Sequence, residues 1–296
     1  MTTENPIEGG LRVDAWMPPE MAERAEAVGA KKAGMAFATM LLLAVLAGAF
    51  IALGAAFATT AASSPLPYSV NRLLAGLTFS LGLILVVVAG AELFTGNNLI
   101  VMAWADGKVT TAKLLRCWAI VYLGNLIGAI ATAVLVFQSK QYTFGGGAIG
   151  KTALSIAQAK CNLPFVQAFA LGILCNALVC MAVWLCYSAR TTTDKILSIV
   201  FPISAFVACG FEHSVANMYF IPIGLLIKRF AAPDFWALIH DSPASYGALT
   251  WMGFVRNLVP VTLGNTFGGS VMVGLLYWFV YLRKPAGRAT SPSDHG

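Results

Sequence analysis

Two side chains that can do acid–base chemistry, Glu212 and His213, stand side by side inside a long hydrophobic stretch. They belong to the string GFEHSVANM, which begins at Gly210, within a run from Ile196 to Ile227 that exceeds the roughly 20 apolar residues needed to cross a bilayer. Ionisable groups at membrane depth usually face a cavity and mark a permeation or proton path. The pair could also serve only to hold helices together through hydrogen bonds, so the sequence leaves a structural role open.

The composition places this chain in a lipid bilayer. Hydrophobic residues make up 58% of it and charged residues 11%, whereas a soluble domain carries about a quarter charged residues. The net charge is +6, but the lysines and arginines lie in the short segments between apolar runs, where topology signals belong. We therefore predict an integral membrane protein without a nucleic-acid partner. The six cysteines show neither CxxC nor Cys/His metal spacing, so the sequence predicts no metal site and no cofactor.

Six hydrophobic runs without strict alternation predict transmembrane helices. They are approximately Ala33 to Ala62, Leu73 to Ala105, Cys117 to Phe137, Leu163 to Tyr187, Ile196 to Ile227 and Phe254 to Leu282. The distribution of Lys and Arg between the two sides predicts that both termini are cytoplasmic. The predicted divisions are an N-terminal segment with a short amphipathic helix (1–32), a transmembrane domain (33–283) and a disordered cytoplasmic tail (284–296).

An internal repeat divides the transmembrane domain into halves at about 33–138 and 160–283. Each half shows a Glu followed five residues later by an Asn, and then a Leu-Gly-Asn motif. These marks fall at Glu92, Asn97 and Asn125 in the first half and at Glu212, Asn217 and Asn265 in the second. Nearby glycines, such as Gly128 and Gly268, are expected to allow close helix packing. Three spans per half make the repeats inverted, so the fold class is an all-α membrane protein of six helices.

The second and fifth helices are expected to be broken at the membrane midplane, as inverted repeats of this kind require. We predict the breaks at Thr95-Gly96 and Cys209-Gly210, because glycine tolerates the necessary dihedral angles. The half-helix N-termini that follow would carry partial positive charge. They could therefore attract an anion to the centre of the membrane.

Three motifs carry a resemblance to a known family. They are AELFTG from Ala91 to Gly96, GFEHSVANM from Gly210 to Met218 and PVTLGN from Pro260 to Asn265. Together they resemble the formate/nitrite transporter family, and the similarity runs from about Lys32 to Arg283. Within the family the chain is most similar to the formate channel branch, because it contains APDFW, from Ala232 to Trp236, followed by a long segment that reaches Leu249. The pair Thr95-Gly96, however, also looks like the nitrite branch.

The resemblance implies an aquaporin-like protomer in a homopentamer, with one pore through each protomer. It implies a channel for small monovalent anions, chiefly formate, in the bacterial cytoplasmic (inner) membrane, with nitrite or hydrosulfide as the alternative. By motif, His213 corresponds to the central pore residue, Thr95 faces it from the first broken helix and Asn176 lies beside it. The apolar constrictions correspond to Phe79, Leu83, Leu93, Val179 and Phe206, and the basic vestibule residue to Lys160.

An anion needs assistance in a narrow apolar passage, because an isolated charge in a low dielectric costs many kcal/mol. A basic vestibule near Lys160 would concentrate the anion by electrostatic focusing. We hypothesise that His213 either donates a hydrogen bond to the anion or gives it a proton, so that a neutral acid passes. Thr95 and Asn176 would orient the imidazole or bond the carboxylate.

Glu92 and Glu212 are interpreted as structural, because a fixed carboxylate facing a permeating anion would repel it. We expect both to point away and to bond backbone N–H groups freed at the breaks, and we interpret Asn217 as a capping or packing residue. Two other function classes fit less well. A membrane enzyme would need a catalytic motif such as His-Glu-x-x-His, and a water or polyol channel would show paired Asn-Pro-Ala motifs; the sequence contains neither.

Overall fold

The computed structural model describes residues 15–283, and over that range it is all helical, as predicted. The predicted N-terminal segment is therefore described only from residue 15, and the predicted tail, 284–296, lies outside the described residues. Five helical stretches within 15–283 are long and apolar enough to cross a membrane. The remaining predicted span is divided between two helices of 17 residues each, which lie on either side of a break.

The two repeats share an order of elements, and the second has two short helices in addition, Pro233–Leu238 and Pro243–Tyr246. The first comprises α1 (Pro18–Ala33), α2 (Phe37–Ala62), α3 (Tyr68–Ala89), the 3₁₀ helix η1 (Gly96–Ile100), α4 (Val101–Ala105) and α5 (Thr111–Gln138). After the short η2 (Gln141–Thr143), the second comprises α6 (Ala148–Cys161), α7 (Phe165–Ser188), α8 (Thr192–Ala208), α9 (Ser214–Phe230), α10 (Pro233–Leu238), η3 (Pro243–Tyr246), α11 (Trp251–Phe267), the π-helical η4 (Gly268–Leu275) and α12 (Leu276–Tyr281).

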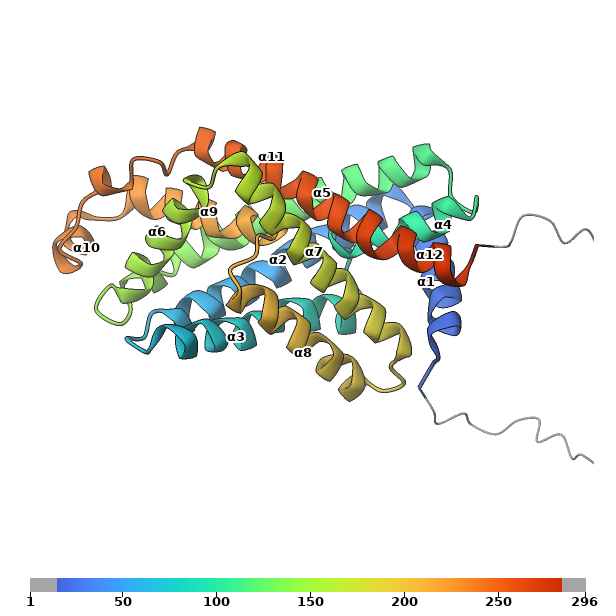
Figure 1. Cartoon of the computed structure of the whole chain (residues 1–296). Helices are drawn as coiled ribbons and strands as arrows, with labels where there is room; N and C mark the ends of the chain where they lie inside the picture. Colours follow the sequence, from blue (N-terminus) through green and yellow to red (C-terminus); the bar gives the residue numbers. More distant parts are fainter. Residues whose placement is uncertain (1–14, 284–296) are drawn as a thin grey trace, which may run out of the picture.

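The long helices lie side by side in one bundle (Figure 1). Helices α6 and α10 occupy one end of it, whereas α1, α4 and α12 occupy the other, so the first and last described helices share an end. Helix α6 precedes α7 as α1 precedes α2, and is thus the counterpart of α1. The hydrophobic runs did not predict α6, because only four of its fourteen residues are buried and its composition is mixed.

Helix α1 is docked on the bundle. Its apolar side chain Met21 shares a buried cluster with Met102 of α4. Next to this contact Lys108 donates to Glu26, Nζ to Oε2 2.5 Å. Burial raises the pKa of the Glu26 carboxyl, and the bond from Lys108 opposes that rise. The predicted amphipathic helix is therefore present, and protein covers its apolar face.

Each repeat contains one interrupted helix, and both interruptions begin at a glycine with positive φ. Gly90 follows α3 with φ 81° and Gly210 follows α8 with φ 75°, a region that residues with a Cβ rarely adopt. The predicted break at Cys209-Gly210 is confirmed. The predicted break at Thr95-Gly96 is wrong in position, because α3 has already ended at Gly90 and Thr95 instead precedes η1.

Close backbone contact holds the helix pairs α2–α5 and α7–α11 together. A Cβ on Gly128 of α5 would overlap the carbonyl oxygen of Val45, and one on Gly268 would overlap that of Ile173. The two contacts occupy equivalent places in the two repeats. The expected role of these glycines in helix packing is confirmed.

We predict that Gly128→Ala lowers the thermal stability of the protein in detergent. Alanine is the better helix former, so a loss would come from the clash with Val45, which costs about 1–3 kcal/mol in an overpacked contact. Gly247→Ala is the matched control, since a Cβ there has nothing within 4 Å. The measurement is the midpoint of thermal unfolding, and an unchanged midpoint for Gly128→Ala would contradict the packing argument.

Candidate functional site

One asparagine side chain holds the backbone of the first break. Asn125 of α5 accepts a hydrogen bond from the Phe94 N–H at 2.9 Å. It donates to the carbonyls of Glu92 at 2.9 Å and Ala44 at 2.7 Å. The bonds to Phe94 and Glu92 replace helical partners that the break removes, at a depth where lipid offers none, and the bond to Ala44 ties the break to α2.

Asn265 of α11 does the same at the second break. It accepts from the Ser214 N–H at 2.8 Å and donates to the carbonyls of Glu212 at 2.9 Å and Gly172 at 2.8 Å. Its backbone partners match those of Asn125 one for one. The two asparagines thus fix the two non-helical segments by the same geometry.

The Glu212 carboxylate is buried in a cluster of side chains. Lys160 Nζ lies 2.6 Å from one of its oxygens, and Asn217 donates to the other at 2.7 Å. Asn257 accepts from Asn217 at 2.7 Å, which links the cluster to α11. Every polar group that faces the carboxylate is thus a donor, as a buried charge requires.

The Glu92 carboxylate has an equivalent cluster in the first repeat. Lys32 Nζ lies 3.2 Å from its Oε2, and Asn97 donates to the same oxygen at 2.7 Å. The expectation that Glu92 and Glu212 bond freed backbone N–H groups is therefore wrong. Lysine reaches them from α1 and α6, because a buried carboxylate needs a cation more than a neutral donor, and the asparagines Asn125 and Asn265 serve the backbone instead.

His213 connects the two breaks. It is the N-cap of α9, where its Nδ1 accepts from the Ala216 N–H at 3.0 Å. Its Nε2 lies 3.0 Å from Thr95 Oγ1, at the end of the first break. An Nδ1 that accepts a hydrogen bond carries no proton, so the neutral ring is protonated on Nε2 and donates towards Thr95. Both side chains are buried, with His213 3% exposed.

Asn176 of α7 contacts Thr95 rather than the imidazole. Its Nδ2 lies 3.3 Å from the Thr95 carbonyl, 2.6 Å from that of Asn265 and 2.7 Å from Asn98 Oδ1. Its own Oδ1 is buried without a partner among the described residues. The structure thus places Asn176 beside the Thr95–His213 pair with one acceptor still free.

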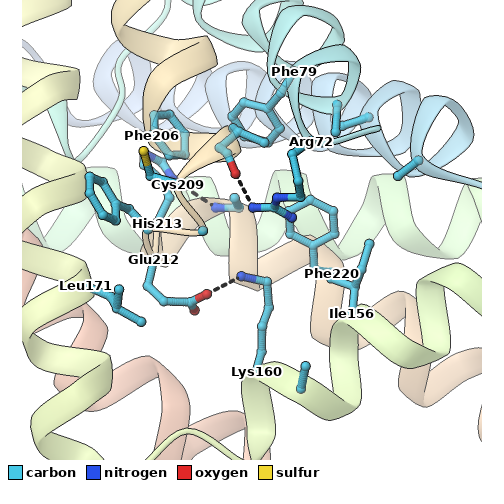
Figure 2. Close-up of a pocket in the computed structure, with 18 of the residues that line it drawn as sticks. Arg72, Phe79, Ile156, Lys160, Leu171, Phe206, Cys209, Glu212, His213 and Phe220 are labelled. Atoms are coloured by element: carbon cyan, nitrogen blue, oxygen red, sulfur yellow. Dashed lines mark hydrogen bonds and ion pairs between the residues drawn. The ribbon is translucent and has the colours of Figure 1, made fainter. Parts of the chain in front are cut away.

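Two cavities penetrate the bundle from opposite ends. The Lys160 cavity, of about 400 Å³, is lined by residues that include Lys160, Glu212, His213, Arg72, Phe79, Phe206 and Phe220 (Figure 2). The Lys32 cavity, of about 330 Å³, is lined by residues that include Lys32, Glu92, Arg24, Lys195, Leu83 and Leu93. No residue lines both cavities, so the two are separate in this structure.

Four of the residues predicted as apolar constrictions line the two cavities. Phe79 and Phe206 pack edge to face with ring centroids 5.5 Å apart, and Phe206 stacks on the His213 imidazole at 5.9 Å. Leu83 and Leu93 line the Lys32 cavity. Val179 is also buried on α7 but lines neither cavity.

Sequence reasoning missed several residues of these cavities. Phe220, which stacks on Phe79 at 6.3 Å, looked like one more apolar residue of a membrane run. Asn257 carries no motif of its own. Lys32 could have been found, because it stands near the end of the helix before the first span as Lys160 does before the fourth. Arg72 directly precedes the hydrophobic run that starts at Leu73, so in the sequence it is one of the charges between apolar runs.

Inverted three-helix repeats, two opposed cavities and a buried polar pair between apolar side chains define a membrane channel of the six-helix, broken-helix class. The family model described as formate/nitrite transporter matches residues 19–279. The chain belongs to the formate/nitrite transporter family, a family of channels and transporters, and is not an enzyme.

The relatives are similar over nearly their whole length. The formate channel FocA of Escherichia coli K12 is 43% identical over 287 residues, which is 96% of this chain and 99% of that one. FocA of Haemophilus influenzae is 43% identical over 264 residues, or 88% and 93%. A solved structure, a pentameric formate channel with formate bound, superposes with a TM-score of 0.79 at 45% identity, covering 83% of this chain and 98% of that one.

We predict that Asn265→Ala destabilises the protein, because it leaves the Ser214 N–H and the Glu212 carbonyl unpaired in the membrane and removes the bond that ties the break to Gly172 of α7. Each buried group left unsatisfied costs about 1–3 kcal/mol. Thr266→Ala on the same helix is the control, since its hydroxyl bonds only the Thr262 carbonyl one turn away. Thermal unfolding in detergent should separate the two variants, and equal midpoints would refute the role of Asn265.

We also predict that Lys160 and Glu212 are coupled in stability. Lys160→Met leaves the buried Glu212 carboxylate without its cation, and breaking a buried pair from one side costs about 3–5 kcal/mol. The double variant Lys160→Met/Glu212→Gln should recover much of that loss, because no charge is stranded. A double-mutant cycle on the unfolding midpoint measures the coupling, and additive effects would show that the pair contributes none.

Proposed function

We propose that this chain forms a pentameric channel that passes formate across the bacterial inner membrane, with both termini cytoplasmic and with His213 coupling passage to protonation. The observation that carries the proposal is the buried contact of 3.0 Å between His213 Nε2 and Thr95 Oγ1, located between two opposed cavities. The names of the relatives support the substrate and the pentamer, since these are formate channels and one is solved as a pentamer with formate bound.

The geometry supplies polar contacts where an anion would otherwise meet only apolar side chains. An anion that passes Phe79 and Phe206 from the Lys160 cavity reaches the Nε2–H of His213 and the Thr95 hydroxyl. Both groups can donate a hydrogen bond to a carboxylate. Asn176, which bonds the Thr95 carbonyl, has a free Oδ1 that can accept the O–H of a protonated acid. These contacts fit an anion and its conjugate acid alike.

Protonation of His213 would alter this arrangement at one atom. A second proton can enter the ring only at Nδ1, where it displaces the hydrogen bond from the Ala216 N–H. The resulting imidazolium has lost its cap and can release the Nε2 proton to a formate oxygen, which yields formic acid and a neutral ring. Formic acid crosses the leucine constriction without the desolvation penalty of a charge. The neutral ring that remains carries its proton on Nδ1; when Nε2 takes up a proton from the solvent of the Lys160 cavity and Nδ1 releases one, Nδ1 accepts from the Ala216 N–H again.

The substrate is tested with purified protein in liposomes. We expect formate flux to exceed that of nitrite, acetate and hydrosulfide, and to rise as the pH falls, because each formate then passes with a proton. Protein-free liposomes are the control for direct permeation of the acids. A nitrite or hydrosulfide preference would overturn the substrate, and flux of water alone would overturn the anion channel.

We predict that His213→Asn lowers formate flux by on the order of tenfold or more and removes its pH dependence, since the central group can no longer carry a proton. Asn is a good N-cap and can still accept from the Ala216 N–H, so α9 should keep its start. His213→Phe removes both functions and should lower flux further. His240→Asn, at an exposed loop residue, is the control. Unchanged flux and pH profile in a folded pentamer would contradict the role of His213.

A further inference from the structure

The Lys160 cavity contains three side chains that carry a full charge: Arg72, Lys160 and Glu212. The Lys160 ammonium and the Glu212 carboxylate are 2.6 Å apart, so their fields largely cancel at distances well beyond that separation. Lys160 therefore contributes little net attraction for an anion in the cavity. The net electrostatic field in the cavity therefore comes mainly from Arg72, whose guanidinium stays charged at every pH of interest.

Arg72 lies on the first turn and a half of α3 and crosses the cavity wall to the end of α8. Its Nε donates to the Ala208 carbonyl at 3.2 Å, and a terminal nitrogen donates to the Val207 carbonyl. Among residues 15–283 no carboxylate forms an ion pair with it. Figure 2 shows Arg72 and Lys160 entering the cavity from opposite sides, with only Lys160 directed at Glu212.

The position of Arg72 acts on an anion in two ways. The carbonyls at the C-terminus of α8 carry partial negative charge, which would repel an anion at the cavity wall, and the guanidinium neutralises them. A guanidinium has five N–H donors, of which the carbonyls use two. The others remain for a solute in a cavity whose wall is mostly apolar, lined by side chains such as Ala75 and Phe220, so that the charge is weakly screened.

We propose that Arg72 is the residue that recruits the anion into the Lys160 cavity: it supplies the net charge of the cavity and the first hydrogen-bond donors that a carboxylate meets. This inference rests on the proposed anion-channel function. It adds a residue that acts before the constrictions, independently of His213. In this proposal the Lys160–Glu212 pair stabilises the structure, and Arg72 attracts the anion.

The test is the dependence of formate flux on ionic strength in Arg72→Gln, Arg72→Lys and wild-type liposomes. Loss of one charge at contact distance should lower flux at about 10 mM salt by roughly 3- to 10-fold, and the difference should shrink near 1 M salt, where the Debye length is about 3 Å. Arg72→Lys keeps the charge and should keep most of the flux and its salt dependence. Arg229→Gln is the control, because Arg229 is an exposed cation on α9 outside the cavity.

A second measurement changes the charge of the cavity at a different residue, Cys209. Cys209 is exposed and lines the same cavity, and among the described cysteines it alone is exposed. Modification with an anionic thiol reagent should reduce wild-type formate flux more than a cationic reagent of equal size, and the cationic reagent should restore flux to Arg72→Gln. Equal effects of both reagents, or an unchanged salt dependence in Arg72→Gln, would overturn the role of Arg72. If wild-type protein passes no formate at all, the proposed function fails instead.

Discussion

The structure depends on how backbone groups are satisfied where two helices are broken inside the membrane. Lipid offers no hydrogen-bond partner, so each N–H and C=O released at Gly90 or Gly210 must be met by protein. Asn125 and Asn265 meet two such groups each and bond a third carbonyl on the neighbouring unbroken helix, and they can do so only because α5 and α11 lie against their neighbours at backbone contact. The glycine contacts, the asparagine hydrogen bonds and the helix breaks therefore depend on one another, and the same combination occurs in both repeats.

The residues at the centre of the channel occupy positions at which the two repeats differ. Alignment of Glu92 with Glu212 places Leu93 opposite His213, and Thr95 opposite Val215. Alignment of the carbonyls that bond Asn125 and Asn265 likewise places Gly48 opposite Asn176. Each polar residue of the centre thus has an apolar or small counterpart. The repeat supplies two identical supports, and the substitutions between them leave one polar site on the path between two apolar closures.

The sequence was informative where a residue type admits one explanation. The spacing of Glu and Asn in a membrane run predicted the inverted repeat, and Cys209-Gly210 predicted the second break, because few other roles fit such residues in lipid. It failed where partners come from distant elements. The lysine that pairs with Glu212 stands on α6, which no hydrophobic run revealed, and Thr95-Gly96 was mistaken for a break because Gly90 ends α3 first. Contacts of Asn176 depend on how α7 is rotated, which residue identity does not fix.

An anion channel must attract its substrate without retaining it, since a site that binds too tightly blocks conduction. Two free lysines at the mouths would deepen each cavity into a trap. Here Lys32 and Lys160 are each paired with a glutamate, so they stabilise the broken segments and add little electrostatic attraction for an anion. The unpaired charge of the Lys160 cavity is a guanidinium already engaged with two carbonyls, which spreads its charge and weakens its hold on any single anion. A shallow attraction outside a polar centre is the condition under which both entry and exit remain fast.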